Sequence, residues 1–487
     1  MNLLKVKKAG IIKPIIAILI PIIGVMIMLL INRVNMSDIS ISCSRWNDEV
    51  AYYKTLEGII NGGPFGKWGY NGSYSVYGNF SAWNPSVYFF LIIWSKLFGL
   101  SYVSPIYLNI FLWGLAFFIF ERLCKPSIKQ LLFSFLVFCS FSMGIRYIFS
   151  ITPEATIGAL FLIYCSLMYK INESYSKIAL VFSMLILVFL IMVRGYFAAF
   201  GFAMIIILWK EKRIKSSAVQ ISIILASVVS FFLAEKYLSA SFFTDTSMFG
   251  WLFNKDIFIS SLKEGYDVTY NFVYDALVNR NSIKGSWYLC YIVLGIAVLV
   301  VALKKRNLLW SSIVVIWLGL FAAMWLMYTP REGSRCLMDI VIVGGVFLPL
   351  FFTNAIEQVV YTVLVSIIFV LMTWKSVDGF YTDLPIKDEE ICAALDNTQL
   401  DKIMPLASDS WDNTVACSLD VRHNELYALP TGFGINFCYD EYILDNLDDL
   451  LMKYIYVGAD TSLDNSLMEN GIKCIAEYGD VKIYQAR

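Results

Sequence analysis

The chain has 487 residues, of which 58% are hydrophobic and only 16% are charged, and its mean hydropathy is +0.66. Soluble domains carry about 25% charged residues, so this composition excludes an ordinary soluble protein and predicts a polytopic α-helical membrane protein. The formal net charge of zero hides an asymmetry, because residues 375–487 hold 8 Lys and Arg against 21 Asp and Glu. We therefore predict an acidic soluble domain at 375–487, attached to a basic membrane domain at 1–374.

Eleven apolar segments approach the roughly 20 residues that a membrane span needs. We predict spans at about 11–33, 103–121, 131–149, 153–170, 177–193, 195–209, 217–238, 287–303, 308–328, 337–353 and 358–374. With a cytoplasmic N-terminus, the short basic loops ERLCKPSIK, WKEKRIK and KKR all fall on the cytoplasmic side, as the positive-inside rule requires. Loops 34–102 and 239–286 and the C-terminal domain are then expected outside the cytoplasm.

The segment NPSVYFFLIIWSKLFGL decides this topology. It predicts a helix over 85–98 that is short for a span, with Pro85 in its first turn and Gly99 as its stop. We predict that this helix lies in the outer membrane interface, and a short true span remains the alternative.

The acidic tail has the pattern of a small α/β domain. A helix is expected at 387–400 and strands at 404–410 and 453–460, and residues 474–485 predict two strands around a Gly-Asp turn. For the tail cysteines (Cys392, Cys417, Cys438 and Cys474), disulfides and unpaired thiols both remain open. The chain has one histidine, His423, which argues against a zinc site or a histidine-based triad.

Several charged residues are predicted to gather at the outer membrane face. They are Arg45, Asp48, Glu49, Arg146, Glu154, Arg194, Arg331 and Arg335. A charged group costs roughly 2.5–3.5 kcal/mol at the centre of a bilayer, so a collection of them on one face points to a site. Arg194 interrupts an apolar stretch that two short helices would fill, which favours a ligand-lined break over an arginine that reaches the headgroups.

Carboxylates and arginines facing one cavity suit a particular chemistry. Arginine matches the oxygens of a lipid phosphate, and a carboxylate in a partly dry cleft can take a proton from an acceptor hydroxyl. The competing interpretation is that Asp48 and Glu49 only begin a helix that runs to Ile60. The acids are too few and scattered for an octahedral metal site, so we predict no cofactor, with a divalent cation as the alternative.

The order of these motifs resembles the C-type (GT-C) membrane glycosyltransferases, which include lipid A aminoarabinose transferases and protein O-mannosyltransferases. The resemblance rests on the acids of DEVAYY after the first span, the NPSVYFFLIIWSKLFG helix, the Pro-acid step at Glu154 and the Arg194-Gly195 step. Asn84 stands where the family has a basic residue, so the sequence departs from the family's pattern at that position.

The resemblance implies a role for each matching residue. Asp48 would be the base on the acceptor, with Glu49 orienting it or holding its loop, and Glu154 would be a further acid of the site. The donor phosphate would meet four arginines, Arg146, Arg194, Arg331 and Arg335. The implied partners are a polyprenyl-phosphate-linked sugar, a cell-envelope glycan and membrane lipids, and no nucleic acid.

Length and layout are similar to phage-type serotype-converting glucosyltransferases, which add glucose from undecaprenyl phosphate to the O-antigen of lipopolysaccharide. This resemblance implies an inverting hexosyltransferase of the bacterial cytoplasmic membrane, with a glucosyl group favoured. The alternatives are an O-antigen polymerase or ligase, and a transporter or flippase of lipid-linked sugars. A transporter is expected to show paired repeats and charges near the middle of the membrane, and the sequence shows neither.

Overall fold

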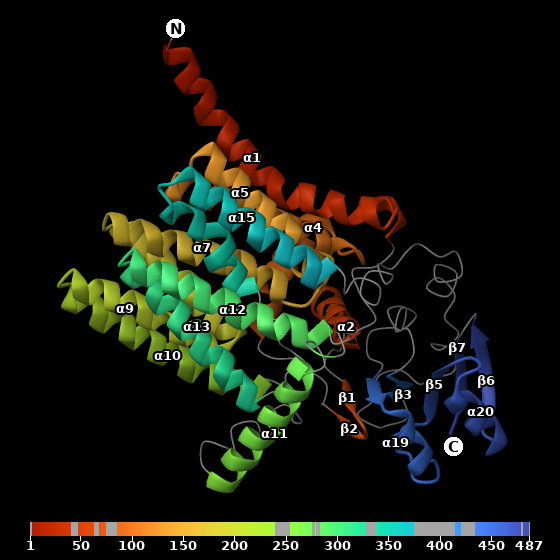
Figure 1. Cartoon of the computed structure of the whole chain (residues 1–487). Helices are drawn as coiled ribbons and strands as arrows, with labels where there is room; N and C mark the ends of the chain where they lie inside the picture. Colours follow the sequence, from red (N-terminus) through yellow and green to blue (C-terminus); the bar gives the residue numbers. More distant parts are fainter. Residues whose placement is uncertain are drawn as a thin grey trace.

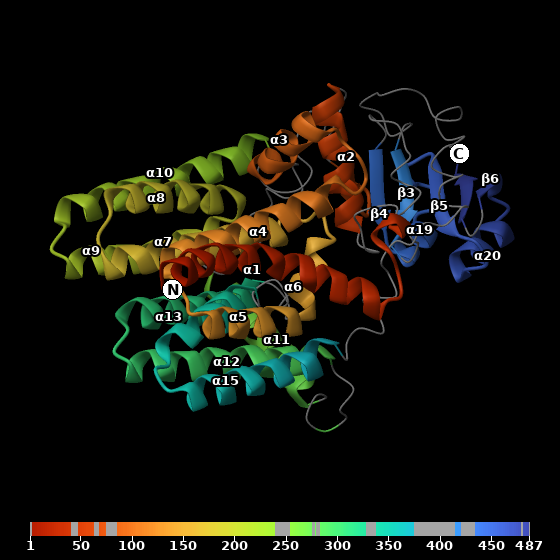
Figure 2. The same cartoon turned by 90° about the horizontal axis from the view of Figure 1, so that it is seen from above.

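A computed structural model describes most of the chain, and it is mainly helical (Figure 1). The described residues are 2–39, 47–62, 68–74, 85–238, 254–274, 278, 283–327, 338–374, 414–419, 434–478 and 481–486. A bundle of apolar helices occupies one side of the molecule and a small β-sheet occupies the other (Figures 1 and 2). The expected class, a helical membrane fold with a small C-terminal sheet, is therefore confirmed in its general form.

The bundle is built from helices whose apolar side chains cover most of their surface. They are α1 (Asn2–Ile31), α4 (Ser104–Cys124), α5 (Ile128–Ser140), α6 (Ser142–Ile148), α7 (Glu154–Glu173), α8 (Lys177–Val193), α9 (Gly201–Lys210), α10 (Ile214–Leu238), α12 (Ile283–Lys304), α13 (Leu308–Met327) and α15 (Ala355–Phe369). A further apolar helix covers Met338–Phe351, and its middle is the π-helix η8 (Val341–Phe347).

Among the described residues, four helices are long and apolar enough to cross a membrane. They are Ile12–Ile31, Ser104–Cys124, Glu154–Glu173 and Ile214–Leu238. The other apolar helices are shorter, so the pattern is that of a membrane-embedded protein while the number of eleven spans stays a prediction.

One of the expected spans is broken, and another begins with a turn of 3-10 helix. The segment predicted as one span at 131–149 is the pair α5 and α6, which meet at a bend of 78°. The span predicted at 195–209 begins with the 3-10 helix η3 (Gly195–Phe200) and continues as α9. Apolarity alone does not reveal such breaks, because both halves of a bent segment are equally apolar.

Three other helices belong to the two regions predicted to be external, 34–102 and 239–286. They are α2 (Asn47–Asn61), α3 (Phe89–Phe98) and α11 (Lys255–Tyr274). The predicted helix at 85–98 is present as a 3-10 turn, Pro85–Tyr88, followed by α3. Gly99 ends it with φ +86° and donates its backbone N–H to the Ser95 carbonyl, as the sequence predicts. The membrane position of this helix stays a prediction.

The sheet has seven strands in the order β2-β1-β4-β3-β5-β7-β6. The strands are β1 (Trp68–Tyr70), β2 (Ser73–Tyr74), β3 (Thr414–Ser418), β4 (Gly434–Cys438), β5 (Tyr454–Gly458), β6 (Lys473–Tyr478) and β7 (Val481–Gln485). Pairing is parallel from β1 through β4 and β3 to β5, and antiparallel at both ends of the sheet. The predicted strand at 453–460 and the predicted strand pair at 474–485 are both present, whereas the predicted helix at 387–400 and the predicted strand at 404–410 lie outside the described residues.

Both faces of the sheet are buried. Alternate residues of the central strands, such as Val415 and Cys417, belong to the same buried cluster as the bundle. The intervening residues, such as Ala416, pack in a second cluster with α19 (Asp440–Asp445) and α20 (Ser462–Glu469). The sheet is thus anchored on the bundle through one face and covered by two short helices on the other.

The sheet extends beyond the predicted 375–487 segment. Strand β1 belongs to the external region predicted at 34–102, yet it pairs in parallel with β4 along Trp68 to Tyr70. The turn after β1 is fixed as well, since Gly72 donates its N–H to the Asn436 side chain and Tyr439 donates its N–H to the Asn71 side chain. The strand that follows α2 is therefore part of the C-terminal sheet.

Helix packing inside the bundle generates the first prediction, at Gly158 of α7. A Cβ placed there would lie 2.8 Å from the buried ring of Trp113 and 2.9 Å from the Met338 sulfur. We expect Gly158→Ala to lower the free energy of unfolding by about 1–3 kcal/mol, as overpacking does. Gly319 of α13 has no atom within 4 Å of such a Cβ, so Gly319→Ala is the matched control and should raise stability by up to about 1 kcal/mol. Thermal unfolding in detergent measures both, and equal shifts would contradict the packing argument.

Candidate active site

The turn between α6 and α7 is the scaffold of the candidate site. Its backbone leaves helical geometry from Phe149 to Pro153, which frees carbonyl groups in an apolar surrounding. The side-chain amide of Asn109, on α4, donates to the carbonyls of Ile148 at 3.1 Å and Ser150 at 2.7 Å. One buried asparagine therefore stabilises a conformation that the bundle would otherwise disfavour.

Glu49 docks α2 onto this turn. Its carboxylate accepts the Ser150 hydroxyl through Oε1 and the Ile151 backbone N–H through Oε2 at 2.9 Å. Ser150 also lies 2.6 Å from the Thr152 hydroxyl. Glu49 is fully buried, so these bonds form away from bulk water. The first turn of α2 is thus held against the beginning of α7.

A buried ion pair lies next to this contact. Arg194 Nη2 is 2.8 Å from Glu154 Oε1, and both residues are at least nine-tenths buried. Glu154 follows Pro153 as the first residue of α7, where the helix dipole favours a carboxylate. Arg194 ends α8 in extended conformation, which produces the break before η3.

Glycine at 195 allows the break in the chain to pack closely. A Cβ at Gly195 would lie 2.9 Å from the ring of Phe231 on α10. The Arg194-Gly195 step therefore combines a charge with the close helix approach that only glycine permits.

The electrostatics of the cluster are set by burial. Burial raises the pKa of the Glu49 carboxyl to about 8, although the bonds from Ser150 and Ile151 and the charge of Arg146 oppose the rise. The negative charge of Glu154 adds to it. A raised pKa favours the protonated form of the Glu49 carboxyl. Its geometry is that of a residue that holds α2 in place.

The structure thus brings together four of the predicted site residues, Glu49, Arg146, Glu154 and Arg194. All four are buried, and the charges of Arg146 and Glu154 both act on Glu49. The backbone of Asp48 lies in α2, which confirms the predicted helix, but its side chain lies outside the described residues, as do Arg331 and Arg335. The predicted catalytic and phosphate-binding roles stay predictions.

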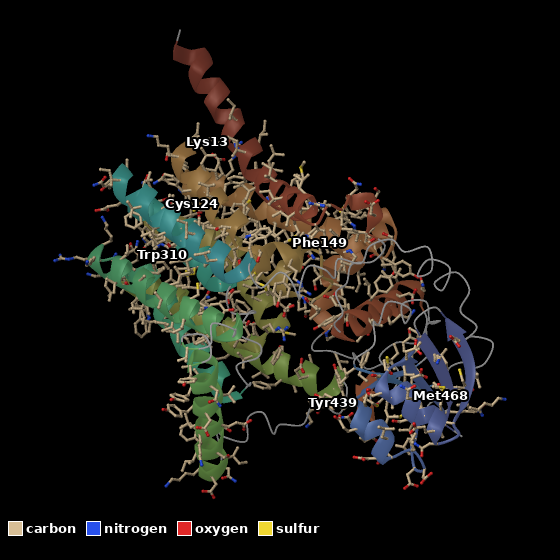
Figure 3. All side chains as sticks on the ribbon, turned by 45° about the vertical axis from the view of Figure 1, so that its right-hand side comes forward. Lys13, Cys124, Phe149, Trp310, Tyr439 and Met468 are labelled. Carbon is tan, nitrogen blue, oxygen red and sulfur yellow. The ribbon has the colours of Figure 1, made fainter. Side chains whose placement is uncertain are left out.

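The cluster lies at the end of the bundle that faces the sheet. Phe149 of the scaffold turn is on that side, whereas Lys13 and Cys124 mark the opposite end (Figure 3). At the opposite end Lys13 pairs with Glu121 at 3.7 Å and donates to the Pro126 carbonyl. The basic loop after α4 and the candidate site are therefore at different ends of the bundle.

Three buried polar residues of the described structure were not singled out from the sequence. Asn109 and Asp339 each interrupt an apolar run, and an isolated polar residue in a span is a functional signal in itself. Asp339 is buried and acts electrostatically on Cys165 of α7. Ser150 gave no such signal, since serine is common in turns.

In the part of the chain that the structure describes, no three His, Cys, Asp or Glu side chains are grouped as metal ligands. Because the Asp48 side chain is not among these residues, the expected absence of a metal stays a prediction.

Comparisons with known proteins concern the fold. No protein-family model and no curated protein matches this chain. Among solved structures, the apo oligosaccharyltransferase of Archaeoglobus fulgidus gives a TM-score of 0.52 at 11% identity, covering 91% of this chain and 69% of that chain. AglB from Archaeoglobus fulgidus, in complex with an inhibitory peptide and a dolichol-phosphate, gives 0.50 at the same identity and coverage.

ArnT from Cupriavidus metallidurans, bound to undecaprenyl phosphate, gives 0.49 at 11% identity and covers 96% of this chain and 98% of that chain. The fold of this chain is therefore similar to that of the oligosaccharyltransferases, which agrees with the GT-C resemblance of the sequence at the level of the fold.

The raised pKa of Glu49 predicts a pH-dependent stability. The native carboxyl keeps its proton up to about pH 8, whereas an unfolded glutamate loses it near 4.5. Stability should therefore fall as pH rises between these values. Glu49→Gln can keep both contacts, because its amide nitrogen can donate to the Ser150 hydroxyl oxygen and its amide oxygen can accept the Ile151 N–H. Glutamine does not titrate, so this variant should lose Glu49's contribution to the slope. Melting temperatures from pH 5 to 8 test this, with exposed Glu469→Gln as the control that keeps the slope.

The Arg194–Glu154 pair predicts strong coupling between its two members. Removing one partner leaves a buried charge, so Arg194→Gln or Glu154→Gln should each cost about 3–5 kcal/mol of stability. The double variant should cost much less than the sum, because the second substitution removes the charge that the first one leaves without its partner. Arg122→Gln, which breaks the half-exposed contact of Arg122 with Glu121, should cost no more than about 1 kcal/mol. Additive losses in the unfolding free energies would contradict the coupling.

Proposed function

We propose that the protein is an inverting glycosyltransferase that moves a hexosyl group from undecaprenyl-phosphate-sugar to a cell-surface glycan. A glucosyl group and the O-antigen of lipopolysaccharide are the favoured donor sugar and acceptor. In this proposal the chain lies in the bacterial cytoplasmic membrane with its N-terminus in the cytoplasm. Residues 375–487, completed by β1 and β2, then lie on the outer face.

The observation that carries the proposal is the presence of two buried guanidinium groups in one cluster at the end of the bundle that faces the sheet. Arg194 is paired with Glu154, and the charge of Arg146 acts on Glu49. Buried guanidinium groups in a low-dielectric surrounding interact strongly with an anion. A phosphate suits them, because guanidinium donors match its oxygens. Arg331 and Arg335 are proposed to add to the same phosphate site.

The proposed reaction is a single displacement. Asp48 takes the proton of the acceptor hydroxyl, the acceptor oxygen attacks the anomeric carbon, and the bond from that carbon to the phosphate oxygen breaks. The electron pair leaves with the undecaprenyl phosphate, whose negative charge the arginines stabilise. Glu49 holds the start of α2, which carries Asp48, on the scaffold turn, and Glu154 orients Arg194.

The fold supports a lipid-linked donor. AglB, whose fold is similar, has been solved with a dolichol-phosphate, which is also a polyprenyl phosphate. The choice of a hexosyl group and of a glycan acceptor comes from the resemblance of the sequence to serotype-converting glucosyltransferases. Neither a metal nor another cofactor is part of the proposal.

Two other classes of protein act on related lipids and are the alternatives. An O-antigen polymerase or ligase would also use lipid-linked glycans, and a flippase would move them without chemistry. The position of the cluster of Glu49, Arg146, Glu154 and Arg194 at one end of the bundle favours the transferase, because the substrate site of a transporter is expected near mid-membrane.

The test is transfer from radiolabelled undecaprenyl-phosphate-glucose to O-antigen in membranes that contain the full chain. We expect wild-type transfer of single sugars, a loss of at least about 100-fold in Asp48→Asn, and a comparable loss in Arg194→Gln. Exposed Asp267→Asn, in the second external region, is the control that keeps activity. Label in multimers of the repeat unit would favour a polymerase, label moved across the bilayer without transfer would favour a flippase, and full activity of Asp48→Asn would contradict its role as the base.

A further inference from the structure

The break between α5 and α6 frees backbone groups inside the bundle. The chain leaves helical geometry at Phe141, so the Ser140 carbonyl and the Ser142 N–H have no partner within their own helices. In an apolar surrounding each such group costs several kcal/mol unless it finds a hydrogen bond elsewhere. The 78° bend therefore needs support from another segment.

The support comes from the end of α15. There the helix widens into the π-helix η10 (Val370–Trp374). Ser142 donates its N–H to the Thr373 hydroxyl oxygen at 3.2 Å, and Trp374 donates its ring N–H to the Ser140 carbonyl at 2.9 Å. The Thr373 hydroxyl donates in turn to the Phe369 carbonyl at 2.7 Å. One turn of one helix thus satisfies both groups that the break exposes.

This clasp, made by Thr373 and Trp374, is buried at Thr373 and half-buried at Trp374. Thr373 is only 1% exposed, and the rings of Phe141 and Phe369 lie 5.4 Å apart beside it. The wider turn of a π-helix places Thr373 and Trp374 together at the break, and such insertions are frequent at functional sites.

The clasp controls the direction of α6, and α6 carries Arg146. Helix α6 has seven residues, too few to fix its own orientation, and Arg146 lies one turn after Ser142. Its side chain is 5% exposed and belongs to the candidate site. A small rotation of α6 about the break would move this guanidinium relative to Glu49 and Arg194.

We propose that Thr373 is a positioning residue for Arg146: through the Ser142 N–H it sets the direction of α6 and with it the affinity of the site for the phosphate of the lipid donor. The inference rests on the proposed function and extends it to a residue that lies in the last predicted span. Thr373 itself does not touch the phosphate. Its effect must therefore disappear when Arg146 is absent, which distinguishes positioning from general support of the fold.

The experiment measures binding of undecaprenyl phosphate to the full chain in nanodiscs, together with the melting temperature. Thr373→Val keeps the shape and removes the hydroxyl, and we expect the dissociation constant to rise about tenfold. Thr373→Ser restores the hydroxyl and should return the constant to within about twofold of wild type. The matched control is Thr362→Val on the same α15, since the buried Thr362 hydroxyl makes no hydrogen bond within the described residues. It should leave binding unchanged.

Arg146→Gln provides the decisive background. In that variant Thr373→Val should change the dissociation constant by less than about twofold, because the group that it positions is gone. Trp374→Phe, which removes only the second bond of the clasp, should weaken binding in the same direction if Thr373→Val does not fold.

The outcomes separate the two proposals. Wild-type protein that does not bind undecaprenyl phosphate contradicts the proposed function. Wild-type binding that Thr373→Val and Trp374→Phe leave unchanged overturns the positioning role alone. An equal loss of affinity from Thr373→Val with and without Arg146 also overturns it, because the threonine would then act through the fold in general.

Discussion

The structure depends on hydrogen-bond partners for the backbone groups that are not in helices inside an apolar bundle. A turn such as 149–153 survives there only when side chains from other segments supply the missing bonds. Asn109 does so from α4 and Glu49 from α2, so the turn joins segments that are far apart in the sequence. The same requirement operates at the α5–α6 break, where α15 provides the donors and acceptors. The polar contacts that allow the irregular backbone are therefore the contacts that assemble the site.

Charge is distributed differently at the two ends of the bundle. At one end Glu121 contacts both Lys13 and Arg122, and both of these basic side chains are at least partly exposed. At the other end, Arg194 is paired with Glu154 and the charge of Arg146 acts on Glu49, and all four residues are buried. The charges of the second cluster therefore interact in a drier surrounding than those of the first. The acidic sheet beside this end carries the opposite net charge to the membrane domain.

The sequence predicts the helical class, the helix from Asp48 to Ile60, the Gly99 stop and the terminal strand pair, because each has a local cause in apolar content, glycine or strand pattern. It also predicts Glu49, Arg146, Glu154 and Arg194 as site residues, since buried charges in apolar segments are rare. The resemblance implies that Glu49 orients the base or holds its loop, but the sequence could not predict that Glu49 bonds to the 150–151 turn, because that contact follows from tertiary packing. The π-helix at 370–374 and the break at Phe141 cannot be predicted either, because neither has a local signature in the sequence. The two segments stabilise each other through tertiary hydrogen bonds.

The pairing of β1 with β4 has a consequence for how the protein is made. Gly72 and its partner Asn436 are 364 residues apart, so the ribosome synthesises the membrane helices in the interval between the two. The sheet can close only after the bundle has been inserted, and pairing over such a separation slows folding. Until then β4 has an unpaired edge of the kind that recruits strands from other chains. A polypeptide that begins after residue 374 would keep that edge permanently, so the tail cannot form its complete sheet as an independent domain.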